Sequence, residues 1–179
     1  MKKLNLILPL ALILCFMVGC QDKEAMAELE AMKAQAALEE QNKELVLHFY
    51  DEIDKQNFET AIAMFGPDAK IYGSGGFEPA KPEDLRPMFP VWYTAFPDYI
   101  HNIQDVIAKG DKVVVKTTYT GTHEGDFYGT PPTGNTFKYL GIHILTIKEG
   151  KIVEAWVLED MLYLWQQLGM ELKPKEGEL

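Results

Sequence analysis

A β-hairpin signal in the last third of the chain constrains the fold more than any other stretch. The segment Lys148-Glu149-Gly150-Lys151 lies between two runs rich in β-branched and aromatic residues, which is a strong local pattern for two strands joined by a tight turn. If the central Glu-Gly pair forms a two-residue loop, the flanking lysines face each other and the turn fixes the register of both strands. A short helix, 161–168, is predicted to follow and to end at Gly169.

In that register His143 lies opposite Trp156, and Tyr139 lies opposite Asp160. Because side chains alternate between the two faces of a strand, these four residues are predicted to share one face with several apolar side chains. A carboxylate and an imidazole on an apolar surface predict a half-buried acid/base pocket, which the helix after the second strand would close at one end.

Asp160 and His143 are therefore the candidate catalytic residues, and Tyr139 and Trp156 are candidates for contacting the substrate. An aspartate that loses hydration on an apolar face holds its proton more tightly, which suits general acid/base catalysis. Both candidates also fit a structural role. Asp160 is a favourable N-cap for the helix that starts at Met161, and His143 fits a buried histidine bonded across the sheet. The sequence leaves both alternatives open.

The rest of the chain predicts an α+β domain. Helices are expected at 43–56 and 58–65, a short strand at 70–72 and a proline-interrupted helix at 82–96. Alternating segments at 99–108 and 112–122 add two strands to the hairpin, giving a four-stranded antiparallel meander. Trp92 is predicted either to line a cavity or to pack in the core, and His123, at the start of a glycine-rich loop, either to line the mouth of the pocket or to face solvent.

Several separated motifs occur in order: Tyr119 to Gly134 (YTGTHEGDFYGTPPTG), Gly141-Ile-His-Ile, the run from Gly150 to Asp160 with its Trp156, and Gln166-Gln-Leu-Gly169. Together they resemble the SnoaL-like polyketide cyclase (ester cyclase) family over roughly residues 43–170. The resemblance implies a nuclear transport factor 2-like fold, a curved antiparallel sheet wrapped by the N-terminal helices into a cone. It also implies cofactor-free aldol-type cyclisation of a small hydrophobic carbonyl compound with Asp160 as acid/base, and a homodimer formed through the open sheet face.

The first twenty residues predict export from the cytoplasm. Lys2 and Lys3 precede a short apolar run that ends in Gly19-Cys20, and this pattern resembles a bacterial lipoprotein signal. In this interpretation residues 1–19 are removed, Cys20 carries lipid, and the protein is anchored in the cell envelope. An ordinary signal peptide or an uncleaved anchor is the alternative. Residues 20–42 predict a helical spacer, with a coiled-coil contact as the alternative, before a domain at 43–172 and a flexible tail at 173–179.

Composition narrows the remaining functions. The net charge of −10 argues against nucleic acid as a partner. After processing at Cys20 no cysteine is left for catalysis, the histidine spacing follows no metal-binding pattern, and no nucleotide-binding fingerprint follows a strand. We therefore expect no metal and no cofactor. Two functions stay open: an acid/base enzyme, or a non-catalytic lipoprotein that binds a small ligand or a partner. The second is favoured by the lipid anchor and by Thr146, which stands where many relatives carry an arginine.

Overall fold

A computed structural model describes residues 7–171 and residue 173, with side chains from residue 23 onward. The chain divides into two units, Met1–Glu39 and Glu40–Leu179. The first unit holds the N-terminal part of helix α1, Ile7–Asp54, in which residues 23–38 are all exposed. Among the described residues, no helix is both long and apolar enough to span a membrane. The side chain of the predicted lipidation site, Cys20, and the predicted tail, apart from residue 173, lie outside what the structure describes.

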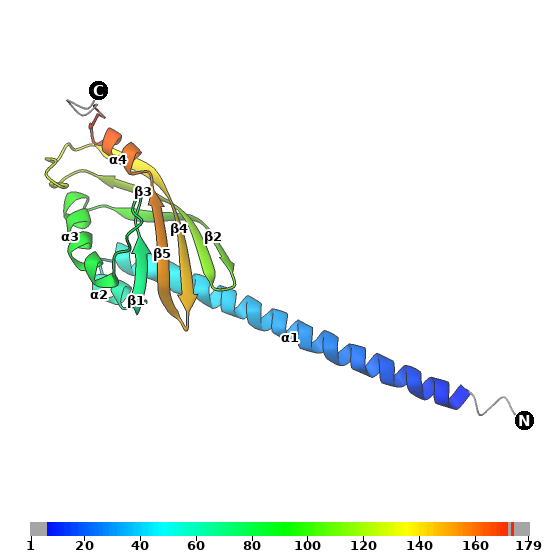
Figure 1. Ribbon diagram of the computed structural model, residues 1–179. Coiled ribbons are helices and arrows are strands. Elements are labelled where there is room, and N and C mark those ends of the chain that lie inside the picture. The colour runs from blue at the N-terminus through cyan, green and yellow to red at the C-terminus, as the bar shows by residue number, and fades with distance from the viewer. Residues whose placement is uncertain (1–6, 172, 174–179) are drawn as a thin grey trace, which may run out of the picture. The chain divides into compact units, whose positions relative to one another are not determined.

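The second unit is built on a five-stranded sheet with the order β1-β5-β4-β3-β2 (Figure 1). Strands β2 to β5 form the predicted antiparallel meander. The expectation of a wholly antiparallel sheet is corrected at one edge, because β1 pairs with β5 in parallel. The meander leaves an edge of β5 unpaired, and β1 satisfies the backbone groups there. The strands are β1 Phe65–Tyr72, β2 Ile100–Lys109, β3 Lys112–Thr122, β4 Thr136–Lys148 and β5 Lys151–Glu159.

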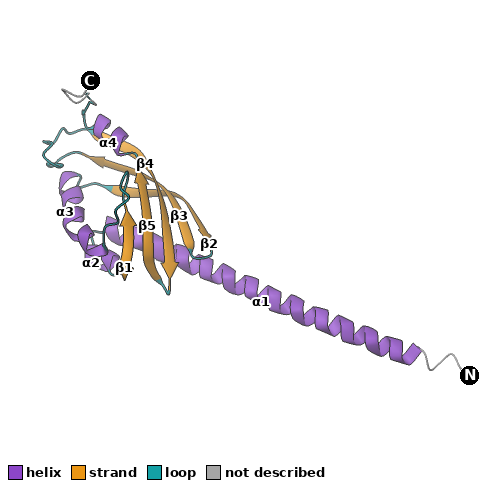
Figure 2. Cartoon of the chain, in the orientation of Figure 1, coloured by secondary structure: helices purple, strands orange, loops and turns teal. Residues whose placement is uncertain are grey.

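Helices α2, Phe58–Ile62, and α3, Leu85–Ala95, lie together on one side of the sheet (Figure 2). A 3-10 turn, Pro82–Asp84, leads into α3, as the proline at a helix start suggests. The predicted interruption of this helix is wrong, because α3 continues through Pro90. Helix α4, Met161–Gln167, follows β5 and ends, as predicted, near Gly169, whose φ is +93°.

The core lies between the inward face of the sheet and the helices. Helix α1 contributes an apolar stripe at helical spacing, Val46, Phe49, Tyr50 and Ile53, all buried. The sheet meets this stripe with alternate residues of its strands, and the burial pattern of β4 shows a nearly regular alternation. The α+β class predicted from the sequence is therefore confirmed, with an open sheet rather than a closed barrel.

The central hairpin forms as predicted at its turn and departs from the prediction beyond it. Glu149 and Gly150 have φ values of +50° and +69°, as a two-residue type I′ turn requires, and Lys148 pairs with Lys151.

One residue further along, the register shifts. Ile147 pairs with Ile152 but Thr146 pairs with Glu154, so Val153 is an extra residue and β5 contains a β-bulge. Because one extra residue turns every later side chain to the opposite face, the predicted pairs are wrong: Val157, not Trp156, lies opposite His143.

Candidate active site

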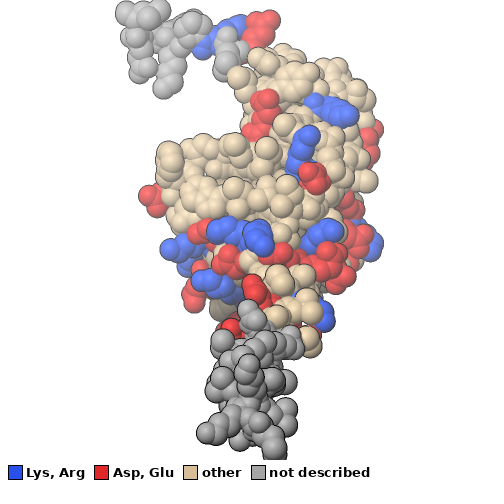
Figure 3. Space-filling model, turned by 90° about the vertical axis from the view of Figure 1, so that its right-hand side faces the viewer, with Lys and Arg blue, Asp and Glu red and all other residues tan. Residues whose placement is uncertain are grey.

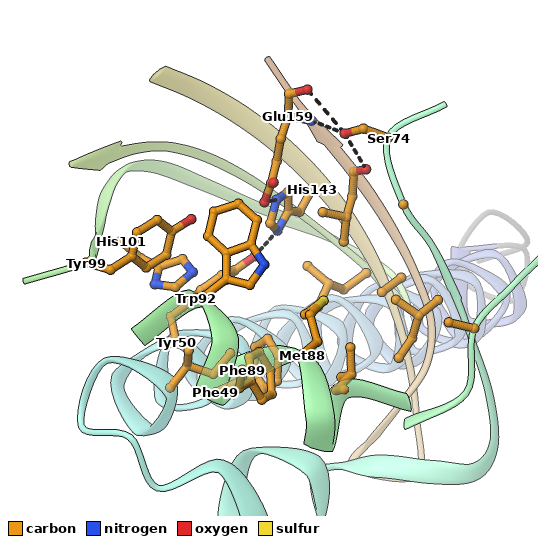
Figure 4. Close-up of a pocket in the computed structure, with 18 of the residues that line it drawn as sticks. Phe49, Tyr50, Ser74, Met88, Phe89, Trp92, Tyr99, His101, His143 and Glu159 are labelled. Carbon is orange, nitrogen blue, oxygen red and sulfur yellow. Dashed lines mark hydrogen bonds and ion pairs between the residues drawn. The ribbon is translucent and has the colours of Figure 1, made fainter. Parts of the chain in front are cut away.

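A cavity of about 340 Å³ lies between α1, α3 and the inward face of the sheet (Figure 4). Its walls are largely apolar, with side chains such as Phe49, Met88, Phe89 and Leu145. Its volume falls within the range of small-molecule sites, and such sites combine an apolar lining with a few convergent polar groups. The polar side chains that line this cavity are those of Tyr50, Ser74, Tyr93, Tyr99, His101, His143 and Glu159.

His143, on β4, lies at the centre of a hydrogen-bond network. The Tyr50 hydroxyl bonds to its Nδ1, and the Tyr119 hydroxyl lies 2.7 Å from its Nε2. The carboxylate of Glu159 reaches the same Nε2 at 3.5 Å. Both ring nitrogens therefore have protein partners, and these three side chains fix the orientation of the imidazole. Figure 4 shows the contacts of His143 with Tyr50 and Glu159.

Two features of the backbone make this network possible. Gly141 lies opposite Glu159 on the inward face, and a Cβ at this position would come within 2.6 Å of the Tyr119 ring. Only a glycine therefore leaves room for Tyr119 to reach His143. On the other side, the Ser74 hydroxyl accepts the backbone N–H of Glu159 at 2.7 Å, which ties the end of β5 to the loop after β1.

Burial keeps the tyrosines of the network protonated. Loss of hydration raises the pKa of Tyr50 and of Tyr119 far above the ordinary value, and the negative charge of Glu159 adds to the effect. The pKa of Tyr139 is raised by the same two causes. These hydroxyls therefore act as neutral hydrogen-bond donors and acceptors, not as phenolates.

A second imidazole and carboxylate pair reaches the same cavity through its histidine, His101. Asp54, near the end of α1, lies 2.5 Å from Nδ1 of His101 and also accepts the backbone N–H of His101 at 3.2 Å. The Tyr93 hydroxyl donates to the same carboxylate at 3.3 Å. His101 lies on β2, with only 8% of its side chain exposed, and its ring packs 5.1 Å from that of Tyr50.

The structure places Asp160 outside the cavity. It is exposed and caps α4, since its carboxylate accepts the backbone N–H of Tyr163 at 3.0 Å. The expectation that Asp160 points inward is therefore wrong, and the N-cap alternative describes its position. Because of the bulge in β5, the inward-pointing carboxylate is its neighbour Glu159.

Trp156 is displaced from the predicted face for the same reason. Its side chain is 41% exposed and stacks on Tyr72 of β1 with ring centroids 4.0 Å apart. Tyr139 does point inward and is buried, but its hydroxyl bonds to that of Tyr99 at 2.7 Å, and Tyr139 is not among the residues that line the cavity.

Of the two remaining candidates, one lines the cavity and the other fits neither of its predicted positions. Trp92 lines the cavity. His123 is fully buried, so the solvent-facing alternative is wrong, and its Nδ1 lies 3.1 Å from the Thr133 hydroxyl. Its Nε2 is, among the described residues, the one fully buried side-chain nitrogen or oxygen without a hydrogen-bond partner. His123 does not line the cavity.

Sequence reasoning missed Glu159, Tyr50, His101 and Asp54. A signal existed for three of them. Tyr50 and Asp54 are four residues apart on one helix and so share a face. His101 lies at an inward position of the alternation in β2. For Glu159 no signal existed, because its orientation depends on the bulge.

One group of side chains within the described part of the chain has the composition of a metal site: His48, Asp51 and Glu52 on α1. Asp51 and Glu52 also pair with Lys55, and none of the three lines the cavity.

Comparisons with known proteins agree with this architecture. The model of the SnoaL-like polyketide cyclase family matches residues 44–168. The structure is similar to that of IdmH from Streptomyces antibioticus, a proposed polyketide cyclase, with 27% identity and a TM-score of 0.66 over 72% of this chain and 99% of IdmH. AclR from Streptomyces galilaeus, a proposed hydroxylase, matches with 27% identity and a TM-score of 0.68 over 76% of this chain and 87% of AclR.

A proposed polyketide cyclase from Bacillus cereus is also similar, with 27% identity and a TM-score of 0.62 over 74% of this chain and 83% of that protein. None of the curated proteins compared with the chain matches it. The expected nuclear transport factor 2-like fold is confirmed by these neighbours. Since the family model matches well over half of its residues, the chain belongs to the SnoaL-like polyketide cyclase family.

Proposed function

We propose that the protein is an acid/base enzyme that acts without a cofactor on a small hydrophobic carbonyl compound, in an aldol-type cyclisation or a related proton transfer. The observation that carries this proposal is the presence of two imidazole and carboxylate pairs, His143 with Glu159 and His101 with Asp54, at one largely apolar cavity. An apolar cavity strengthens hydrogen bonds and charge interactions with a bound carbonyl group.

The His143 network suits the role of proton donor toward the carbonyl oxygen. When His143 carries a proton on both nitrogens, Glu159 balances the charge at Nε2, and Nδ1 donates to the Tyr50 oxygen. The Tyr50 hydroxyl hydrogen is then free to point into the cavity, because Tyr50 lines it. A developing enolate or alkoxide oxygen receives this hydrogen bond, and proton transfer through Tyr50 and His143 neutralises it.

The test uses a bicyclic ketone, 2-tetralone, as a probe. Incubation with the protein in deuterated buffer, followed by proton NMR, measures the replacement of hydrogens next to the carbonyl group. We expect the protein to accelerate this exchange by about 100-fold or more over buffer, the scale of general acid/base catalysis. Binding of the ketone, seen as a change in the fluorescence of Trp92, without accelerated exchange would instead support the non-catalytic binding protein. In the sequence, Thr146 stands in place of the arginine of many relatives and so favours the non-catalytic protein. This support is weaker in the structure, because Thr146 does not line the cavity.

The proposed location of the protein is the cell envelope, where a lipid attached to Cys20 acts as the membrane anchor. The support is the basic and apolar N-terminal sequence that ends in Gly19-Cys20. In a bacterial host the full chain is expected to partition into detergent, and a Cys20→Ser variant is expected to stay in the aqueous phase. Mass spectrometry of the mature N-terminus identifies the lipid. A full chain whose Cys20 is unmodified would contradict the anchor.

A further inference from the structure

The two histidines of the cavity differ in which nitrogens are occupied. Each nitrogen of His143 has a protein partner. In His101 only Nδ1 is bonded, to Asp54, and no residue in the described part of the chain bonds its Nε2. That nitrogen is also not fully buried. Among the described residues, the Nε2 of His123 is the one fully buried side-chain nitrogen or oxygen that lacks a hydrogen-bond partner. The Nε2 of His101, which also lacks a partner, is therefore accessible.

The surroundings of His101 fix its ring at the wall of the cavity. The Asp54 carboxylate accepts from both the backbone and the ring of His101, which sets the tautomer with the hydrogen on Nδ1 and a lone pair on Nε2. The rings of Tyr50, Tyr99 and Tyr119 pack at centroid distances of 5.1, 5.3 and 5.1 Å. His101 itself lines the cavity (Figure 4).

We propose that His101 is the catalytic base of this site, with Asp54 as its positioning residue. The inference rests on the proposed function and deepens it, since it assigns the group that removes the proton. Nε2 takes a hydrogen from the carbon next to the carbonyl group, and the electron pair of that C–H bond forms the enolate. The Asp54 carboxylate stabilises the imidazolium that results. In deuterated water the imidazolium exchanges its Nε2 hydrogen for deuterium from the solvent and then delivers that deuterium to the carbon. In an aldol closure the enolate carbon instead attacks a second carbonyl, and the alkoxide that forms takes the proton from the imidazolium.

This assignment gives different roles to the two imidazole and carboxylate pairs: the His143 network donates a proton, and His101 with Asp54 accepts one. Tyr50 lies between them, because its hydroxyl bonds to His143 and its ring packs against His101. The donor to the carbonyl oxygen and the base for the neighbouring carbon are thus close together, as deprotonation next to a carbonyl requires. The substrate class that fits is a ketone or ester with an acidic C–H adjacent to its carbonyl and an apolar ring system.

The test measures the exchange of 2-tetralone in four proteins: the wild type, His101→Ala, Asp54→Asn and His48→Gln. His48 is the matched control, because it is an exposed histidine on α1 outside the cavity. We expect His101→Ala to lower kcat about 100-fold or more, added imidazole to restore part of the rate, and His48→Gln to have no effect. Asp54→Asn is expected to lower kcat with little change in KM and without rescue by imidazole.

The possible outcomes separate this inference from the proposed function. A wild type that does not accelerate exchange overturns the proposed function. A wild type that does, together with a His101→Ala variant of equal kcat, overturns only the assignment of the base. Circular dichroism melting confirms that each variant is folded, and His101→Gln replaces His101→Ala if the smaller side chain prevents folding.

Discussion

Glu159 and Asp160 are neighbours in the chain but lie in different environments. Glu159 points into the domain and reaches His143 at 3.5 Å, whereas Asp160 is exposed and caps a helix. A carboxylate at the cavity can take part in proton transfer, while a capping carboxylate contributes about 1 kcal/mol to stability. The two adjacent acids therefore permit a direct comparison of a functional and a structural carboxylate.

The first prediction uses isosteric amides at these two positions. We expect Glu159→Gln to lower the exchange rate of the probe ketone by about 100-fold, because the charge that balances a protonated His143 is lost. Asp160→Asn is expected to keep both the rate and the stability, since asparagine is an equally good N-cap. NMR exchange rates and thermal melting measure the two effects. A large loss of rate in Asp160→Asn alone would restore the original assignment of Asp160 as the acid/base.

The second prediction concerns stability at high pH. The pKa values of five buried tyrosines are raised in the folded domain, first of all by burial. Above about pH 10 the unfolded chain releases tyrosine protons that the folded domain keeps, so the free energy of unfolding falls as pH rises. Each such tyrosine steepens the fall by about 1.4 kcal/mol per pH unit. The five tyrosines are Tyr50, Tyr93, Tyr99, Tyr119 and Tyr139.

Urea unfolding at a series of alkaline pH values measures this slope, and ultraviolet absorbance of tyrosinate follows the ionisation. We expect these five side chains to ionise only as the domain unfolds. Tyr139→Phe serves as the control, because it removes one ionisable group and leaves the ring. A variant slope equal to that of the wild type would contradict the predicted contribution of Tyr139.

Strand β5 decides which residues reach the cavity. The turn, the two strands and the following helix were predictable from local patterns, because glycine placement and alternation act over a few residues. The bulge at Val153 was not predictable, because no residue type demands it; it depends on how β5 pairs with β4 on one side and β1 on the other. His143 was correctly placed in the interior since it lies on β4, whereas Trp156 and Asp160 lie beyond the bulge.

The third prediction is that deletion of Val153 destabilises the domain by about 3 kcal/mol or more, a loss typical of disrupted core packing. Without the extra residue, β5 pairs in a regular register, so Trp156 turns inward and Glu159 turns to solvent. Val153→Ala keeps the bulge and is expected to cost less than about 1 kcal/mol. Chemical denaturation followed by circular dichroism compares the two variants. Equal stabilities would mean that the bulge does not determine the register.

The domain as a whole has an apolar outer surface opposite its cavity. Five exposed side chains on the outward face of β4 and β5 form what we term the outer patch, with exposures from 39% for Ile144 to 65% for Leu158. Figure 3, a view from the side opposite α3, shows a broad face of the domain with few charged side chains. Patches of this kind usually mark interaction sites. The outer patch consists of Leu140, Ile142, Ile144, Trp156 and Leu158.

The fourth prediction is that a second copy of the chain covers the outer patch. A two-fold symmetric pair brings the same apolar surface of each copy together, and few charges have to be desolvated. We expect light scattering to give the mass of a dimer for the domain, and the double variant Ile142→Lys and Leu158→Lys to give a monomer. Phe77→Ser is the control, because Phe77 is 87% exposed but lies in a loop outside the patch. A monomeric wild type at high concentration would reject the dimer.

Tyr50 and Asp54 are one helical turn apart on α1, and each holds one of the two cavity histidines. The seating of a single helix therefore sets both imidazoles at once. A slide or rotation of α1 by one residue would move Tyr50 and Asp54 together, and both imidazoles would lose these partners at once. Mutations that loosen the packing of α1 are therefore expected to affect both imidazole and carboxylate pairs together, and the α1 side chains that line the cavity with them.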